Sequence, residues 1–171
     1  NESCAEYVWK NDYVTVNYNG TKITVFQVLG TVYMNEGNQN PFHKAEEILS
    51  KVESDIFICD FHGEATSEKI AFSIYFDGKI DIIVGTHTHV QTNDARVMKN
   101  GTMYMTDLGM TGPLEGVIGV APDDIIHRML TGMPVKHTPM VTGKKQFCGL
   151  LVEINENTHK VTNFDIINIV E

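Results

Sequence analysis

The chain of 171 residues lacks clustered positive charge. It contains no run of five Lys or Arg residues, and its formal net charge is −9 at pH 7. A surface that coats nucleic acid or an anionic membrane needs such clusters, so the charge argues against both roles. Any phosphate-bearing ligand would have to be held by metal ions rather than by a basic patch.

Long apolar runs and cysteine motifs are also missing. No segment reaches 18 apolar residues, and no charged start is followed by an apolar core, so we expect neither a membrane span nor a signal peptide. The three cysteines, Cys4, Cys59 and Cys148, show no CxxC spacing. Cys59 lies in an apolar run, which predicts a buried, inert thiol and favours a reducing, cytoplasmic compartment.

Several motifs of known chemistry are absent as well. The sequence has no Walker loop, no GxGxxG, no GxSxG elbow and no HExxH helix. A metallo-β-lactamase pattern fails because Gln91 and Thr92 stand where Asp and His are needed. These absences argue against P-loop enzymes, dinucleotide-binding proteins, serine hydrolases and zincins.

What is present is an ordinary globular composition, with 42% hydrophobic and 20% charged residues, long enough for one domain. The front half alternates short apolar runs with segments of helical spacing. This alternation predicts a sheet with a parallel component. The expected strands are residues 22–29, 55–61 and 80–84, with helices at 42–52 and at 67–75, where Ser67 is the expected N-cap.

The second half of the chain has a different residue pattern, typical of antiparallel strands. We expect a helix at residues 122–130, because Pro122 and the acidic pair Asp123 and Asp124 suit a first helical turn. The whole is therefore predicted to be an α/β fold in which mixed β-sheets are flanked by helices. The expected strands here are residues 103–106, 147–154 and 161–169, with a turn at 155–157 and a loop earlier at 30–40.

Three histidines follow two of the predicted strands. His62 comes directly after residues 55–61, and His87 and His89 come after residues 80–84. The carboxyl ends of neighbouring parallel strands meet at one sheet edge, about 4.8 Å apart, so these side chains should converge. An extended His-x-His would present both rings to one side. Three neutral imidazoles suit Zn, Fe or Mn, so we predict a metal site.

Carboxylates near these histidines have three open readings. Asp60 and Glu64 could be metal ligands, hydrogen-bond partners that orient the histidine rings, or solvated side chains, and we favour the last two. Asp107 is a further candidate of the same kind. The remaining histidines are expected to be structural or exposed: His43, His127, His137 and His159.

Three longer strings carry a resemblance to a known family. Residues 60–69 (DFHGEATSEK), 84–92 (VGTHTHVQT) and 106–113 (TDLGMTGP) resemble the YmdB-type branch of the calcineurin-like metallophosphoesterases. Residues 85–89 are similar to the terminal Gly-His-x-His element of that superfamily, with one extra Thr. The resemblance covers nearly the whole chain and continues through residues 40–42, 117–119, 130–134 and 149–154.

The resemblance implies a sandwich of sheets flanked by helices that hydrolyses phosphodiesters, with 2′,3′-cyclic nucleotides as substrates. It implies two divalent or mixed-valence metal ions, Fe or Mn, with Zn or Mg as alternatives. His62 would be the isolated metal-binding histidine, and His87 and His89 the final pair. Two such ions lie about 3.5–4 Å apart and share a hydroxide that attacks the phosphorus.

One departure from the family is large. The family's N-terminal half supplies an aspartate, a glutamate and an Asn-His element, and no such strings precede Asn1. We therefore expect residues 1–171 to be the C-terminal portion of a single metallophosphoesterase domain that carries no catalytic residue of its own. Such a portion should have little activity alone, and its uncovered sheet edge would favour a homo-oligomer.

Two rival interpretations stay open. The first is a capsule-biosynthesis-type relative on the same fold, which also carries a strand-end histidine and a His-x-His. The second is a non-catalytic metal-binding or regulatory module. Turnover on a phosphodiester small molecule or nucleotide separates that module from an enzyme, whereas metal binding does not.

Overall fold

A six-stranded mixed sheet forms the centre of the computed structural model, which describes residues 12–34 and 39–171. The four inner strands run parallel, and the two edge strands are antiparallel to their neighbours. In spatial order the strands are β1 (Tyr13–Tyr18), β2 (Thr21–Leu29), β3 (Ile56–His62), β4 (Ile82–Thr86), β6 (Met103–Met105) and β5 (Arg96–Val97).

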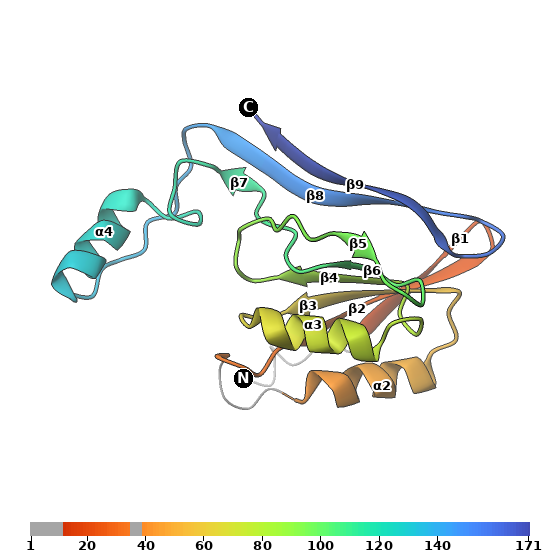
Figure 1. Ribbon diagram of the computed structural model, residues 1–171. Coiled ribbons are helices and arrows are strands. Elements are labelled where there is room, and N and C mark those ends of the chain that lie inside the picture. Colours follow the sequence, from red (N-terminus) through yellow and green to blue (C-terminus); the bar gives the residue numbers. More distant parts are fainter. Residues whose placement is uncertain (1–11, 35–38) are drawn as a thin grey trace, which may run out of the picture.

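Two crossover helices cover one face of this sheet (Figure 1). Helix α2 (Pro41–Lys51) joins β2 to β3, and α3 (Thr66–Tyr75) joins β3 to β4. Apolar side chains at helical spacing turn inward from both helices and meet alternate side chains of the strands, which gives one buried core. The core consists of Phe26, Val28, Ala45, Ile48, Cys59, Phe61, Phe72, Phe76, Ile80, Ile83 and Tyr104.

A smaller antiparallel sheet lies over the opposite face (Figure 1). It contains β7 (Gly112–Pro113), β8 (Lys145–Ile154) and β9 (Val161–Val170). The side-chain amide of Gln91 links it to the loop after β4 by donating to the carbonyls of Gly149 and Ile167, at 3.2 and 2.9 Å. Helices, large sheet and small sheet form three layers, so the predicted α/β sandwich with mixed sheets is confirmed.

Helix α4 (Pro122–Thr131) stands away from these layers (Figure 1). It has the predicted proline at its start and acidic residues in its first turn, and Gly132 ends it in the left-handed conformation. None of its residues is buried. The arm from Leu114 to Lys144, which contains α4, therefore keeps its helix mainly through local signals.

Some sequence predictions are wrong in detail. Ser67 is not the N-cap of α3, because the helix begins one residue earlier and Ala65 occupies the cap without a side-chain hydrogen bond. Strand β4 begins at Ile82 rather than Ile80, which forms an isolated bridge with Asp77. Residues 30–34, 39 and 40 lie outside helices and strands as predicted, whereas residues 35–38 and Cys4 lie outside the described part of the chain.

Cys59 is fully buried in the core, as predicted. Burial raises the pKa of its thiol well above the ordinary value, because the thiolate would lose its hydration. No helix within the described ranges is long and apolar enough to cross a membrane.

Candidate functional site

The register between β3 and β4 brings two of the three predicted histidines together, His62 and His87. His62, the last residue of β3, pairs with Thr86, the last residue of β4, so His87 follows one position beyond. The backbone at Thr106 approaches Gly85 closely. A Cβ atom at Gly85 would lie 1.7 Å from the carbonyl oxygen of Thr106. Only glycine fits at this position, because the obstacle is backbone and cannot rotate away.

A relay of hydrogen bonds orients the His62 ring. The Thr86 hydroxyl donates to Asp60 Oδ1 at 2.7 Å, and the amide of Gln27 donates to Asp60 Oδ2 at 2.6 Å. His62 Nδ1 lies 3.0 Å from Thr86 Oγ1. Because the only hydroxyl proton of Thr86 is already directed at Asp60, this oxygen accepts from His62 Nδ1–H. Nε2 of His62 consequently carries the lone pair that a metal needs.

The His87 ring is oriented from the other side. Its Nε2 lies 3.1 Å from Glu64 Oε2, and a carboxylate at this distance favours the tautomer that carries its proton on Nε2. His87 Nδ1 faces His62 Nε2 at 3.2 Å, and the two rings are perpendicular, with an interplanar angle of 87° and centroids 5.0 Å apart. In the tautomer with the proton on His87 Nε2, two imidazole lone pairs point toward the same space; in the other tautomer, His87 Nδ1 donates to His62 Nε2.

This arrangement fits an ion held between the two rings. Metal–imidazole bonds of about 2.0–2.1 Å would place ligand nitrogens 3.2 Å apart at an angle of about 100° at the ion. Such an angle suits tetrahedral or octahedral coordination. Within the described ranges, however, no group of three or more His, Cys, Asp or Glu side chains converges on one point. Two imidazoles alone do not complete a coordination shell, so an ion at this position would need further ligands.

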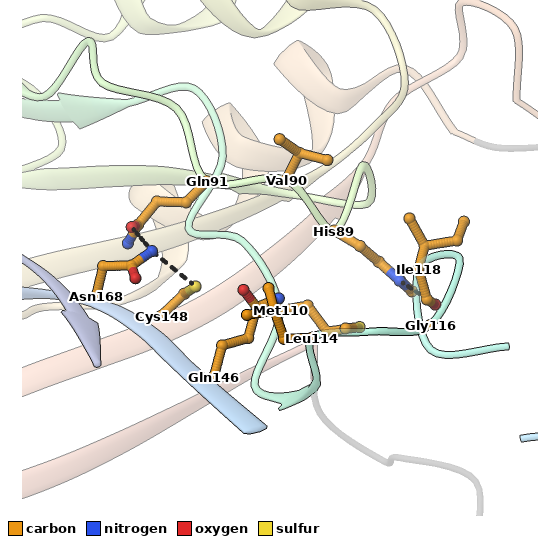
Figure 2. Close-up of a pocket in the computed structure, with 10 residues that line it drawn as sticks. All are labelled: His89, Val90, Gln91, Met110, Leu114, Gly116, Ile118, Gln146, Cys148 and Asn168. Atoms are coloured by element: carbon orange, nitrogen blue, oxygen red, sulfur yellow. Dashed lines mark hydrogen bonds between the residues drawn. The ribbon is translucent and has the colours of Figure 1, made fainter. Parts of the chain in front are cut away.

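His89 departs from its predicted position. We expected an extended His-x-His with both rings on one side, but the strand ends at Thr86, and His87 and His89 have positive φ angles of 109° and 64°. The chain turns there, so the rings diverge, and His89 Nδ1 points to the carbonyl oxygen of Ile118 at 3.2 Å (Figure 2). Each such backbone conformation costs about 1–3 kcal/mol in a residue other than glycine.

A cavity of about 340 Å³ lies beside His89, between the loop after β4 and the small sheet. Figure 2 shows the amides of Gln91 and Asn168 meeting at its rim, where the Asn168 nitrogen donates to Gln91 Oε1 at 3.0 Å. Met110, Leu114 and Ile118 provide apolar walls opposite. The volume lies in the range of small-molecule sites.

Asp107 is buried, and none of its hydrogen bonds is to a histidine ring. Its oxygens accept from the ammonium of Lys69 and from the backbone amides of Thr88 and Gly109. Lys69 and Thr86 were not predicted as residues of the site. A signal for Lys69 exists, because it precedes Phe72 and Phe76 at helical spacing and thus lies on the buried face of α3.

Asp94 supports the segment that leads to Asp107. Burial raises the pKa of its carboxyl group, but hydrogen bonds from the hydroxyls of Thr106 and Thr92 and from the Thr106 amide outweigh this effect. The pKa of Asp94 therefore lies below its ordinary value. Thr92 Oγ1 in turn accepts from the Asp107 amide at 3.0 Å, which continues the network.

The other histidines lie elsewhere. His137 Nε2 is 3.3 Å from an Arg128 nitrogen on the exposed arm, and His159 lies in the turn between β8 and β9. His127 is exposed, and its carbonyl accepts from the Thr131 hydroxyl within α4. The backbone amide of His43 donates to the Asn40 side chain at the start of α2, and the His43 ring takes no part in this cap.

Layered sheets with histidines at the ends of adjacent parallel strands define the metallophosphoesterase-like class of α/β sandwich. The family model described as "YmdB-like protein" matches residues 5–167, and the chain belongs to the YmdB-like family. This result confirms the resemblance that was noted from residues 60–69, 84–92 and 106–113.

Individual relatives agree with this assignment. The chain is 41% identical to a 2′,3′-cyclic-nucleotide 2′-phosphodiesterase of Bacillus subtilis, over 88% of this chain and 57% of that protein. A novel phosphatase from Mycoplasma pneumoniae superimposes with a TM-score of 0.88 at 36% identity, over 99% of this chain and 61% of that structure. A hypothetical protein from Thermus thermophilus gives a TM-score of 0.89 at 31% identity, over 94% and 62%. The chain spans only 54–57% of the length of the curated relatives that it matches.

Proposed function

We propose that this protein is a metal-dependent phosphodiesterase that hydrolyses 2′,3′-cyclic nucleotides. The observation that carries the proposal is the pair of imidazole nitrogens, His62 Nε2 and His87 Nδ1, which face each other at 3.2 Å. With the proton of His87 on Nε2, beside Glu64, both lone pairs are directed at the same space. Two lone pairs in such a position repel each other unless a cation or a proton lies between them.

The chain's own residues prepare the site for that cation. Asp60, through Thr86, sets the tautomer of His62, and the nearby Glu64 carboxylate favours the matching tautomer of His87. Orienting partners of this kind typically change metal affinity by about 10–100-fold. The ring of His89 diverges from the other two, so His89 enters the proposed ligand set on the sequence prediction alone; its Nδ1 faces the Ile118 carbonyl, which leaves Nε2 as its donor atom. Asp60 and Glu64 thus act on the rings rather than on the metal.

Divalent ions, when bound, would polarise a phosphate ester and supply hydroxide at neutral pH. They would also give an acidic protein, of net charge −9, the positive charge that an anionic substrate requires. Fe or Mn suits the imidazole donors, with Zn or Mg as alternatives. Because the chain corresponds to little more than half of its relatives, we propose that further ligands and the proton donor lie outside these 171 residues.

The substrate class follows from the Bacillus subtilis relative, whose name specifies 2′,3′-cyclic nucleotides. The cavity beside His89 offers apolar walls and amide groups, which suit a planar base with polar edges. A cytoplasmic location and a homo-oligomeric state remain predictions from the sequence.

The test is turnover by the protein expressed from its complete gene. Purified protein is incubated with Mn²⁺ and 2′,3′-cyclic AMP, and the nucleoside monophosphate is followed by chromatography. We expect product with Mn²⁺, none after chelation, and a loss of at least about a hundredfold in His62→Ala. His159→Ala serves as the control and should keep wild-type turnover. Metal binding without turnover on any phosphodiester would instead favour the non-catalytic module.

A further inference from the structure

The first turn of α3 buries two adjacent charged side chains, Glu68 and Lys69, which are 9% and 1% exposed. Their side chains extend in opposite directions along the carboxyl ends of the strands of the large sheet. Glu68 accepts hydrogen bonds from the Thr31 amide and hydroxyl at 2.9 Å and from the Val32 amide at 3.3 Å. It therefore holds the loop that follows β2, which carries none of the candidate metal ligands.

Lys69 holds the loop that carries the histidines. Its ammonium group donates to the Thr86 carbonyl at 2.8 Å and to Asp107 Oδ2 at 3.1 Å, and the side chains of Lys69 and Asp107 are each 1% exposed. Asp107 Oδ2 also accepts from the Thr88 amide at 3.0 Å. The ion pair thus binds the carbonyl just before His87 and the amide just after it.

These bonds act where the sheet ends, because the last sheet hydrogen bond to the Thr86 carbonyl, from the Gly63 amide, is long at 3.4 Å. Strand β4 ends at Thr86, and the positive φ angles of His87 and His89 take the chain out of the ladder. Peptide groups at such a turn need other partners in place of the regular ladder hydrogen bonds. A buried ion pair adds little net stability compared with apolar side chains of the same size, so stability alone does not account for this one.

We propose that Lys69 and Asp107 are positioning residues that fix the two peptide groups around His87 and thereby aim its Nδ1 at His62 Nε2. The inference rests on the proposed metal site, but it concerns the backbone that sets the site rather than the ligands. Neither residue contacts the metal or the substrate in this role. Without the pair, His87 should sample other orientations, and the site should bind a cation less tightly.

The experiment compares two kinds of variant of the protein expressed from its complete gene. Lys69→Met leaves a buried carboxylate without its partner, which endangers folding, so the double variant Lys69→Met/Asp107→Asn, which is neutral, is the main test. Glu68→Gln is the matched control, because it alters an adjacent buried charge that ties a different loop. Circular dichroism selects a temperature at which all variants are folded.

Two readouts distinguish positioning from general support. In calorimetric titration with Mn²⁺, the dissociation constant should rise about tenfold or more in the double variant and less than about twofold in Glu68→Gln. In metal-free protein, hydrogen exchange at residues 86–90 should accelerate on the order of tenfold in the double variant only. A purely structural pair would lower thermal stability and leave both readouts at the level of the control.

Equal Mn²⁺ affinity in the double variant and the control, or unchanged exchange at residues 86–90, would overturn the inference. Failure of the wild-type protein to bind Mn²⁺ would refute the proposed function instead. Hydrogen exchange would then decide on its own whether the pair fixes the loop.

Discussion

Helices α3 and α4 have the same length of ten residues, yet they are stabilised in different ways. Helix α4 has a proline in its first turn, two acidic residues beside it and a left-handed Gly132 at its end, but buries no residue. Helix α3 has no side-chain cap, but it buries Glu68, Lys69, Phe72 and Ser73. Local signals therefore define α4, whereas packing against the sheet defines α3.

This difference decides where a precise site can be built. A metal centre needs ligands held to within a fraction of an ångström by groups that are themselves fixed. The loops around α3 meet that requirement, because Phe72 anchors the helix in the core and Lys69 ties it to the histidine loop. In the arm around α4, by contrast, Met129 and Leu130 are 79% and 80% exposed. We expect mutations in the two regions to differ accordingly.

The largest contrast should appear in stability. Phe72→Ala removes a ring that is fully buried against Phe42, Phe61 and Phe76, and it should lower the free energy of unfolding by about 3–5 kcal/mol. Leu130→Ala in α4 should change it by less than about 0.5 kcal/mol. Urea unfolding followed by circular dichroism measures both. A similar loss in the two variants would mean that α4 is packed in solution.

A smaller contrast concerns the relay behind His62. Thr86→Val keeps the side-chain shape but removes the hydroxyl that joins Asp60 to His62, so Mn²⁺ affinity should fall about tenfold, or about 1.4 kcal/mol. Thr131→Val removes a comparable hydroxyl bond to the His127 carbonyl within α4 and should leave affinity unchanged. Calorimetric titration gives both constants. Unchanged Mn²⁺ affinity in Thr86→Val would show that this relay does not support the metal site.

The smallest contrast is in the pH dependence of stability. The pKa of Asp94 is lower in the folded protein than the ordinary value of about 3.9, because hydroxyls of Thr106 and Thr92 stabilise the carboxylate against the cost of its burial. Such a group stabilises the fold above pH 4, and this contribution is lost as pH falls through the folded-state pKa. Since the Asp94 side chain is still 34% exposed and solvent screens its interactions, the effect should be below about 1 kcal/mol.

Asp94→Asn should therefore lower stability at pH 7 and flatten the acid limb of the stability curve. Asp124 in α4 provides the comparison, since hydrogen bonds from Thr138 lower the pKa of its carboxyl group as well. Asp124→Asn should flatten the curve less. Urea midpoints between pH 3 and pH 7 measure both profiles, and a larger effect of Asp124→Asn would reverse the ranking of the two regions.

Much of the fold was predictable because its signals are local or periodic. The inner strands β2, β3 and β4 and the helices between them follow from hydrophobic spacing, and α4 follows from its end signals. Strand β1 was missed because it lies at an edge, and five of its six residues are exposed, so burial imposes no pattern. Strands β5 and β7 contain two residues each, too few for any periodicity.

The candidate site was predictable in place but not in detail. Neighbouring parallel strands bring His62 and His87 together by a general rule of such sheets. The direction of the His89 ring depends on two positive φ angles, and no residue type in this loop predicts them. The partner of Lys69 is separated from it by 38 positions, so the pair becomes visible only when the sheet is assembled.

The central claim is that the strand-end histidines bind a metal ion, and titration of the intact protein with Mn²⁺ tests it most directly. The dissociation constant should rise at least about tenfold in His62→Ala, His87→Ala and His89→Ala. It should stay at the wild-type value in His137→Ala on the exposed arm and in His159→Ala in the β8–β9 turn. The same affinity in all five variants would contradict the account.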